Sequence, residues 1–219
     1  MKFVMISNDI YSVLNFRFDF IKKIRDMGCT VYILAPNLDQ EPEVSKKLLQ
    51  SGFILEKISM DRAGTNPISD LKTIYSIYKT LKKIQADIVF SYTIKPVIYG
   101  SIAASLLGIK KIFVLICGLG NMFQDGKDAK FSIVSTIVNQ LYTLALDRCT
   151  KVFFQNQDDY ELLHSFGILR DPSKGVIVNG SGINLARFNV DPLKLDSNGN
   201  VIPSFIMVAR LLTYKGVLE

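Results

Sequence analysis

Short apolar runs alternate with longer amphipathic segments along most of the chain. Residues 2–7, 30–35 and 111–116 each contain four or more consecutive apolar residues, which is typical of strands buried on both faces. Between such runs, apolar residues recur every three to four positions, as in helices that pack one side against a core. We therefore predict an α/β fold: a doubly wound parallel sheet of seven strands joined mainly by helices through right-handed crossovers.

The bounds of these elements follow from the apolar runs and their stop signals. Gly28, Gly52 and Gly108 directly follow amphipathic segments, where glycine commonly ends a helix. Ser69 is the predicted N-cap of a helix that reaches Gln85. We predict strands at 2–7, 30–35, 53–58, 87–92, 111–116, 150–154 and 175–179. We predict helices at 16–27, 44–50, 69–85, 97–107, 129–146 and 158–166.

The residue composition and the hydrophobic pattern of the sequence change after residue 180. Residues 180–199 are rich in Gly, Ser, Asn, Asp and Pro and lack apolar periodicity, which is typical of a linker. The apolar run Phe205–Ala209 then predicts a strand over 201–209 that is buried on both faces. We predict an N-terminal domain at 1–180, a linker at 181–199 and the first strand and turn of a truncated second domain at 200–219.

Composition narrows the class of protein. The net charge of +6 favours anionic partners, but the basic residues are dispersed, and we expect no nucleic-acid binding. Three cysteines without C-x-x-C spacing indicate free thiols in a reducing cytosol. The longest uncharged run, 131–146, is shorter and more polar than a membrane span, so we expect a buried helix there.

Several common kinds of active site are disfavoured. The segment Gly118-Leu-Gly120-Asn-Met-Phe123 lacks the third glycine of a dinucleotide fingerprint, and the chain has no P-loop. There is no D-x-D pair for a Mg²⁺-bound nucleotide, and His164 is the only histidine. We therefore expect no metal ion, no cofactor and no Ser/His/Asp site.

The remaining candidates follow strand ends, which border the ligand crevice in open α/β sheets. Arg210 and Lys215 come after the apolar run that ends at Ala209, and two cations in one loop suit a phosphate or diphosphate. The candidates near the earlier strands are Asn15, Phe16, Arg17, Thr93, Lys95, Gly118, Gly120, Gly180, Ser181 and Gly182. Each of them also has an ordinary structural role as a solvated charge or a turn former.

Together these segments resemble the retaining GT-B glycosyltransferases of family 4, particularly the bacterial subgroup that extends lipid-linked sugars for capsule, O-antigen and protein glycosylation. The resemblance covers essentially the whole chain. It is most specific at Thr93-Ile-Lys-Pro-Val-Ile-Tyr-Gly100, Gly118-Leu-Gly120, Gly180-Ser-Gly-Ile-Asn184 with Phe188, and Val208-Ala-Arg210 through Lys215-Gly216. It implies two facing Rossmann-like domains, the first for the acceptor and the second for the nucleotide-sugar.

The resemblance also implies roles for the candidates. Arg210 and Lys215 would be the catalytic cations, stabilising charge on the leaving diphosphate without a metal ion. The donor side would comprise Gly180, Ser181, Gly182, Arg210, Lys215 and Gly216, and the acceptor side Asn15, Phe16, Arg17, Thr93, Lys95, Gly118 and Gly120. Because the family's paired-glutamate element is absent from this sequence, we expect the 219-residue chain to be inactive by itself.

We therefore expect a full-length glycosyltransferase that moves a sugar from a nucleotide-sugar, with a UDP-sugar as the expected donor, to a polyprenyl-diphosphate-linked saccharide. It would be cytoplasmic and peripheral on the inner face of the cell membrane. Two alternatives stay open: a non-catalytic binding or interaction domain, and a nucleotide-sugar epimerase or dehydrogenase.

The predicted helix 69–85 offers a membrane contact. Its apolar stripe, which we expect in the core, comprises Leu71, Ile74, Tyr78 and Leu81. The opposite side carries Lys72, Lys79 and Lys83. These lysines are either a solvated surface or an electrostatic docking site for anionic headgroups, without insertion into the bilayer.

Overall fold

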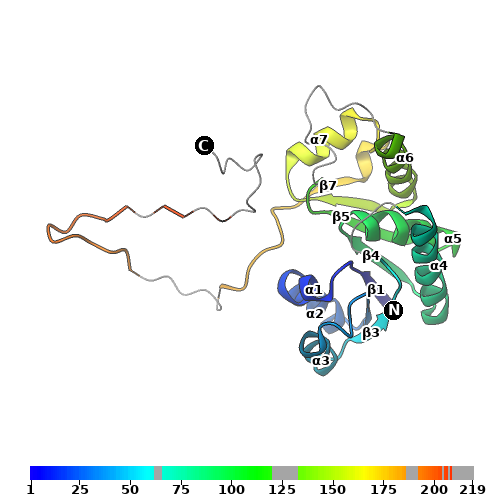
Figure 1. Cartoon of the computed structure of the whole chain (residues 1–219), viewed down its shortest axis with the longest axis horizontal. Coiled ribbons are helices and arrows are strands. Elements are labelled where there is room, and N and C mark those ends of the chain that lie inside the picture. Colours follow the sequence, from blue (N-terminus) through cyan, green and yellow to red (C-terminus); the bar gives the residue numbers. More distant parts are fainter. Residues whose placement is uncertain (62–65, 120–132, 186–191, 204, 207, 209–219) are drawn as a thin grey trace. The chain divides into compact units, whose positions relative to one another are not determined.

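A computed structural model describes residues 1–61, 66–119, 133–185, 192–203, 205, 206 and 208. The chain divides into two compact units, Met1–Gly182 and Ile183–Glu219 (Figure 1). The first unit contains every strand and helix named below. No helix of the described ranges is both long enough and apolar enough to cross a membrane.

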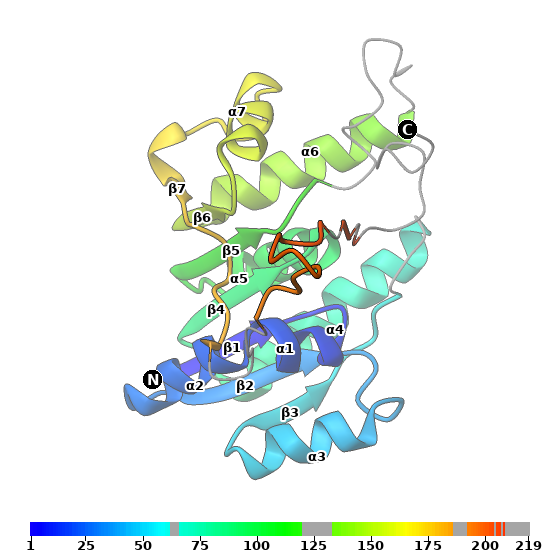
Figure 2. The same cartoon turned by 90° about the vertical axis from the view of Figure 1, so that its left-hand side faces the viewer.

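The first unit is built on a parallel sheet of seven strands within the described residues, in the order β3-β2-β1-β4-β5-β6-β7 (Figure 2). This confirms the predicted α/β class and the predicted number of strands. The order reverses between β1 and β4, where Phe3 lies between Val31 and Ile88 of its neighbours. The strands are β1 (Lys2–Ile6), β2 (Thr30–Ala35), β3 (Ile54–Lys57), β4 (Ile88–Tyr92), β5 (Lys111–Ile116), β6 (Lys151–Phe154) and β7 (Gly175–Ile177).

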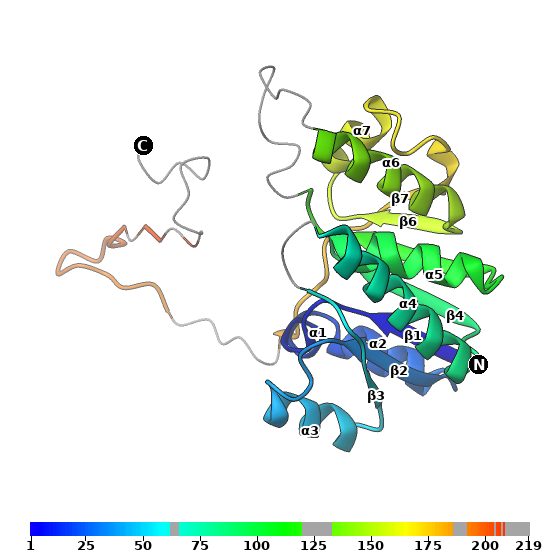
Figure 3. The same ribbon diagram turned by 45° about the vertical axis from the view of Figure 1, so that its right-hand side comes forward.

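Helices cover the two faces of the sheet unequally. One face packs against α4 (Pro67–Ile84), α5 (Ser101–Leu106), α6 (Ile133–Arg148) and α7 (Gln157–Ser165) (Figure 3). The other packs against α1 (Ile10–Phe16), α2 (Phe18–Asp26) and α3 (Pro42–Gln50). On β5 the side chains alternate between these cores: Ile112 and Val114 are buried under the first helix layer, whereas Phe113 faces the second and is only partly buried.

The predicted helix 16–27 corresponds to α2, and a further helix that was not predicted, α1, precedes it. Asp9 caps α1 by accepting a hydrogen bond from the Tyr11 backbone N–H, and buried Ile10 and Val13 anchor that helix to the core. Arg17 then separates α1 from α2 with a non-helical φ of −127°. Arg17 is thus both the C-cap of α1 and the N-cap of α2, so the predicted helix start at Phe16 is two residues too early, and Asn15 and Phe16 belong to α1.

Two predictions for α4 are also wrong. The N-cap is Asn66, which accepts from the Ile68 backbone N–H and precedes Pro67 at the first helical position, so Ser69 lies inside the helix. Leu71 is 66% exposed and does not belong to the core stripe. The helix has apolar residues on more than one side, and packing on the sheet selects the side with Thr73, Ile77, Leu81 and Ile84.

The predicted helix 97–107 begins as a π-helical turn, η1 (Pro96–Gly100), and continues as α5. A glycine is required where this turn meets the sheet. A Cβ atom on Gly100 would lie 2.6 Å from Ser91 Oγ and 3.0 Å from Ile6 Cδ1. The last residue of the segment 93–100 thus has a packing role.

The second unit has little regular structure in its described part. It contains an isolated antiparallel bridge between Leu195 and Val201. The prediction of a buried strand over 201–209 is wrong for the described residues of that run, which form no strand, and Phe205 is 97% exposed. An apolar run becomes a buried strand only beside partner strands, and the described part of this unit supplies none.

Candidate functional site at the carboxyl edge of the sheet

Several polar residues meet where the parallel strands end. Ser7 follows β1, Thr93 follows β4, Cys117 follows β5 and Ser181 lies just after β7. Because these strands are parallel, their carboxyl ends share one edge of the sheet. Arg17, at the junction of α1 and α2, reaches the same edge and connects several of these residues.

Arg17 is the central group of this cluster. The residue is only 6% exposed. Its Nη1 donates hydrogen bonds to Ser181 Oγ and to the Phe16 carbonyl oxygen, and its Nη2 lies 3.1 Å from Cys117 Sγ. All of these partners are neutral, and no carboxylate forms a salt bridge with Arg17 among the described residues.

Buried guanidinium groups normally pair with carboxylates, because an unpaired buried charge is costly. Here the Arg17 Nε also has no hydrogen-bond partner in the described part of the chain. The guanidinium carbon lies 4.9 Å from the centroid of the Tyr92 ring, which supplies a cation–π contact and no negative charge. The arrangement therefore suits an incoming anion, which would complete the hydrogen bonding and neutralise the charge.

Tyr92 is held in place under Arg17. Its hydroxyl lies 2.8 Å from Ser7 Oγ and 2.7 Å from Ser12 Oγ. Burial raises the pKa of Tyr92, so the phenol stays neutral at physiological pH. The ring is thus a fixed, uncharged support for the guanidinium.

Thr93 occupies a strained position beside Tyr92. Its φ of +69° is unusual for a β-branched residue, and its buried Oγ1 has no hydrogen-bond partner among the residues that the structure describes. Within the described ranges, the buried side-chain atoms without a partner are Arg17 Nε, Ser91 Oγ and Thr93 Oγ1. All three lie at or near this edge, where a polar ligand would satisfy such groups.

Lys95, predicted on the acceptor side, already has a partner. Its Nζ lies 3.2 Å from Asp70 Oδ1, and the two side chains are 15% and 19% exposed. Burial, together with a hydrogen bond to Asp70, raises the pKa of Tyr99. Asp70 therefore joins the first turn of α4 to the loop after β4, and the charge of Lys95 is compensated.

The other predicted site residues are divided. Asn15 and Phe16 are exposed beside Arg17. The glycines Gly118, Gly180 and Gly182 have φ values of +125°, +76° and +70°, which fit the turns that follow β5 and β7. The predicted residues that lie outside the described ranges are Gly120, Arg210, Lys215 and Gly216.

Four members of this cluster were not predicted from the sequence: Ser7, Ser12, Tyr92 and Cys117. Tyr92 and Ser7 do carry a weak signal, since each is a polar group at the end of a buried apolar run. Serines at such positions are also ordinary turn residues, so their convergence on Tyr92 emerges only from the fold.

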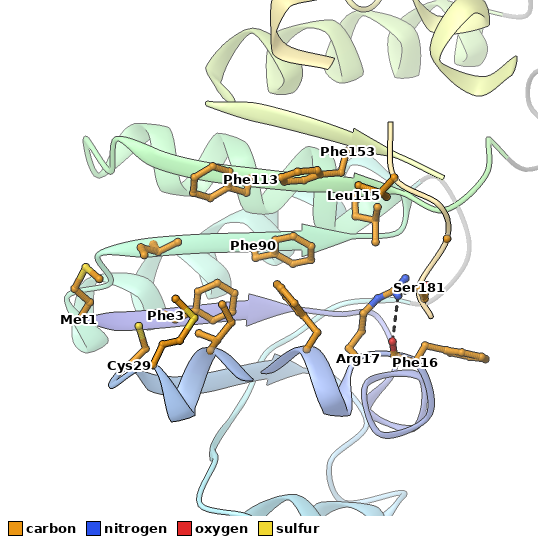
Figure 4. Close-up of a pocket in the computed structure, with 16 residues that line it drawn as sticks. Met1, Phe3, Phe16, Arg17, Cys29, Phe90, Phe113, Leu115, Phe153 and Ser181 are labelled. Carbon is orange, nitrogen blue, oxygen red and sulfur yellow. Dashed lines mark hydrogen bonds between the residues drawn. The ribbon is translucent and has the colours of Figure 1, made fainter. Parts of the chain in front are cut away.

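An apolar cavity of about 480 Å³ opens beside Arg17. Figure 4 shows Arg17 and Ser181 at one end of it and Met1 and Cys29 at the other. Its walls include Phe20 of α2 and the β-strand residues Phe3, Phe90, Phe113 and Phe153. In the part of the chain that the structure describes, no group of three or more His, Cys, Asp or Glu residues could hold a metal ion.

The sequence profile of the glycosyl transferase 4-like family matches residues 4–156, which run from β1 past the end of β6. The chain belongs to this family.

Two curated relatives agree with that membership. An N,N'-diacetylbacillosaminyl-diphospho-undecaprenol alpha-1,3-N-acetylgalactosaminyltransferase of Campylobacter jejuni is 28% identical, with 100% of this chain and 58% of the relative covered. A UDP-Gal:alpha-D-GlcNAc-diphosphoundecaprenol alpha-1,3-galactosyltransferase of Escherichia coli is 31% identical, with 69% of this chain and 39% of the relative covered. The chain thus spans about half the length of these relatives.

Solved structures agree on the fold. A sucrose-phosphate synthase of Thermosynechococcus elongatus superimposes with a TM-score of 0.60 at 9% identity, covering 86% of this chain and 50% of that one. At such low identity the likeness speaks for the shared α/β architecture alone.

Proposed function

We propose that this chain is the acceptor-binding part of a glycosyltransferase that moves a sugar from a UDP-sugar to a polyprenyl-diphosphate-linked saccharide. The observation that carries the proposal is Arg17, a buried cation at the carboxyl edge of a family 4-like sheet whose partners among the described residues are all neutral. An acceptor diphosphate would supply the negative charge that the described partners of this guanidinium do not supply. The printed names of both relatives specify acceptors with a diphospho-undecaprenol group.

In the proposed reaction, the bond between the sugar's anomeric carbon and the donor phosphate oxygen breaks. The acceptor hydroxyl oxygen forms the new bond to that carbon and releases its proton to the departing diphosphate. The products are a nucleoside diphosphate and the lengthened lipid-linked saccharide. We propose retention of anomeric configuration, with Arg210 and Lys215 stabilising the leaving diphosphate in place of a metal ion.

We assign the segments of the chain to the acceptor and donor sides as in the interpretation of the sequence. Residues 1–180 would form the acceptor domain, 181–199 the linker and 200–219 the start of the donor domain. The donor side would include Gly180, Ser181, Gly182 and Gly216, and the acceptor side would include Asn15, Phe16, Thr93, Gly118 and Gly120 around Arg17. Lys95 would support the acceptor loop through Asp70. The protein would act at the cytoplasmic side of a membrane, where a lipid-linked acceptor is reached.

The alternatives fit less well. An epimerase acts on the nucleotide-sugar and needs no second, lipid-linked substrate, whereas both sequence relatives are named as transferases. A purely non-catalytic binding domain would share the fold and the Arg17 site, so measured transfer by a longer protein that contains this chain would exclude it.

Binding and turnover test the proposal separately. We expect the 219-residue chain to bind farnesyl diphosphate, a soluble polyprenyl-diphosphate probe, more tightly than UDP, whose affinity should be roughly millimolar or weaker. We expect no sugar transfer by this chain. Micromolar affinity for UDP, or turnover of a UDP-sugar with a short-chain lipid-linked acceptor, would contradict the assignment of this chain to the acceptor side.

In a longer protein that contains the chain, Arg210→Ala and Lys215→Ala should lower kcat more than they raise KM. The charge that they stabilise develops in the transition state, and each loss should cost about 2–4 kcal/mol, or roughly 30- to 1000-fold in rate. Turnover that stays near wild type in either variant would remove that residue from the diphosphate site.

A further inference from the structure

The outward side of α4 carries an exposed apolar stripe. Ile68, Leu71 and Tyr75 are 68%, 66% and 66% exposed, and they recur at intervals of three and four residues along the helix. That spacing places them together on one side. The opposite side, which contains Ile77 and Leu81, packs on the sheet. The stripe is therefore additional to the residues that anchor the helix.

Basic residues extend the same outward side. Lys72, Lys79 and Lys82 are exposed, and they form no salt bridge among the residues that the structure describes. Lys83, by contrast, lies 2.9 Å from Glu56 Oε1. We call Ile68, Leu71, Lys72, Tyr75, Lys79 and Lys82 the α4 outer surface.

The α4 outer surface differs from an ordinary solvated helix. On α3 a single large apolar residue, Leu49, is exposed beside Lys46 and Lys47. On α4 three large apolar side chains are exposed on the same side as three lysines that form no salt bridge with any described residue. An apolar stripe flanked by lysines is typical of helices that lie in a membrane interface, where the apolar groups enter the headgroup boundary and the cations contact anionic lipid.

The position of this surface matters for the proposed function. Asp70, in the first turn of α4, pairs with Lys95 in the loop after β4, next to the strained Thr93. Since α4 follows β3, its N-terminus begins at the carboxyl edge of the sheet, as Figure 3 shows. Ile68 and Leu71 therefore lie at the same edge as the Arg17 site.

We propose that the α4 outer surface docks on an anionic lipid bilayer, with Ile68, Leu71 and Tyr75 inserted shallowly between headgroups. This docking holds the carboxyl edge close to the depth at which a lipid-linked diphosphate emerges. The reason for docking rests on the proposed function, but the docking itself is measured without any sugar substrate. This proposal differs from the sequence prediction in three ways. Leu71 faces the bilayer and not the core. Lys82 contacts the lipid in place of Lys83, and apolar side chains insert in addition to the electrostatic attraction.

Vesicle co-sedimentation tests the charge and the apolar stripe separately. At low salt the wild-type chain should bind phosphatidylglycerol vesicles and should bind phosphatidylcholine vesicles far more weakly. Changing Ile68, Leu71 and Tyr75 together to Ser should lower the partition coefficient at least tenfold at any salt concentration. Changing Lys72, Lys79 and Lys82 to Gln should lower it about tenfold or more at low salt, and the difference should vanish above ~0.3 M salt.

A matched control uses α3. Lys46→Gln, Lys47→Gln and Leu49→Ser combined remove similar chemistry from another surface helix, and they should leave binding within twofold of wild type. Equal vesicle binding by wild type and both α4 variants would overturn the proposal. Vesicle-free self-association that disappears in the Ser variant would also overturn it, in favour of a second copy of the chain as the occupant.

A fluorescence measurement locates the contact. The chain has no tryptophan, so Leu71→Trp and Leu49→Trp each create a single reporter. Leu71→Trp emission should shift to shorter wavelength on phosphatidylglycerol vesicles and should be quenched by bromine-labelled lipids, whereas Leu49→Trp should show neither change. Vesicle binding without a response at Leu71 would place the contact elsewhere. If the wild-type chain does not bind farnesyl diphosphate but the Leu71→Trp responses are observed, the proposed function is refuted and the docking proposal stands.

Discussion

The two edges of the sheet differ in how fully their polar groups are hydrogen-bonded. At the amino edge, polar groups have close partners: the Lys2 backbone N–H lies 2.7 Å from Asp87 Oδ2, and Lys2 Nζ lies 2.7 Å from the Ile84 carbonyl oxygen. Lys151 and Lys174 likewise donate to the carbonyl oxygens of Ser173 and Asp147. These contacts close the short connections between helices and strands.

At the carboxyl edge, several polar groups have no such partner among the described residues. This edge has Arg17 without a carboxylate, Thr93 with a positive φ, and buried polar atoms without partners in the described ranges. Strain and unsatisfied polar groups cost stability, so they persist where another requirement maintains them. The contrast indicates that the amino edge stabilises the fold and that the carboxyl edge is prepared for a ligand.

The largest expected difference between the edges is in thiol reactivity. Cys117, at the carboxyl edge, is exposed, whereas Cys149, just before β6 at the amino edge, is buried. Cys149 should react with a thiol reagent only after the structure opens, so its labelling should be about a thousandfold slower or more. The measurement is a labelling time course in Cys29→Ser protein, with Cys117→Ser and Cys149→Ser added singly to assign the phases. Comparable rates at both thiols would contradict the contrast.

The next effect is a loss of stability at high pH that originates at the amino edge. Burial raises the pKa of the Cys149 thiol from 9.0 to about 11. The unfolded chain therefore loses this proton near pH 9 while the folded chain keeps it, so the stabilisation is complete below pH 9 and is lost between pH 9 and 11. The loss should be about 3 kcal/mol.

Denaturant unfolding at pH 8 and pH 11 measures this loss, with Cys149→Ala as the control. The buried tyrosines Tyr92, Tyr99 and Tyr142, whose pKa values are also raised, remain in the variant and contribute equally in both proteins. Because the folded thiol is itself half ionised at pH 11, the variant should lose about 2 kcal/mol less than wild type on going from pH 8 to pH 11. An identical loss in both proteins would mean that Cys149 is not buried as described.

The smallest effect compares two residues with positive φ, one at each edge. Thr93 (φ +69°) follows β4, and Gln85 (φ +57°) caps the C-terminus of α4. Glycine adopts this conformation without steric cost, so Thr93→Gly and Gln85→Gly should each raise the free energy of unfolding by up to about 1 kcal/mol.

The two variants should differ in their affinity for farnesyl diphosphate. Thr93→Gly removes a hydroxyl from the anion site and should weaken farnesyl diphosphate binding severalfold, whereas Gln85→Gly should not change it. Calorimetric titration together with thermal unfolding measures both quantities. Weaker binding in both variants, or in neither, would remove Thr93 from the ligand contacts.

The periodic parts of the fold were predictable from the sequence, and the junctions were not. The strand at 111–116 was predicted with its observed bounds because a buried parallel strand is a continuous apolar run. Helix α1 was missed because the segment after β1, with Asn8, Asp9 and Ser12, is also typical of a turn. The outward position of Leu71 was missed because α4 has more apolar residues than one packed side needs, and only the sheet determines which side is buried.

The candidate site shows the same limit. Glycines and cations after strand ends indicated the carboxyl edge of the sheet, where Arg17, Thr93 and Ser181 lie, since that rule needs only the order of elements. The neutral surroundings of Arg17, the pairing of Lys95 with Asp70 and the unpartnered Thr93 hydroxyl depend on which loops meet in space. No local pattern in the sequence contains that information.

The most direct test of the account is calorimetric titration of farnesyl diphosphate into wild type, Arg17→Met and Arg170→Met. Arg170 is an exposed arginine paired with Asp147 and serves as the matched control. We expect Arg17→Met to lose at least tenfold in affinity while keeping or gaining stability, because methionine, an unbranched apolar side chain, removes a buried charge that no described carboxylate pairs with. Arg170→Met should bind as wild type does. Unchanged affinity in Arg17→Met, with the fold intact, would contradict the claim that this guanidinium is the anion site.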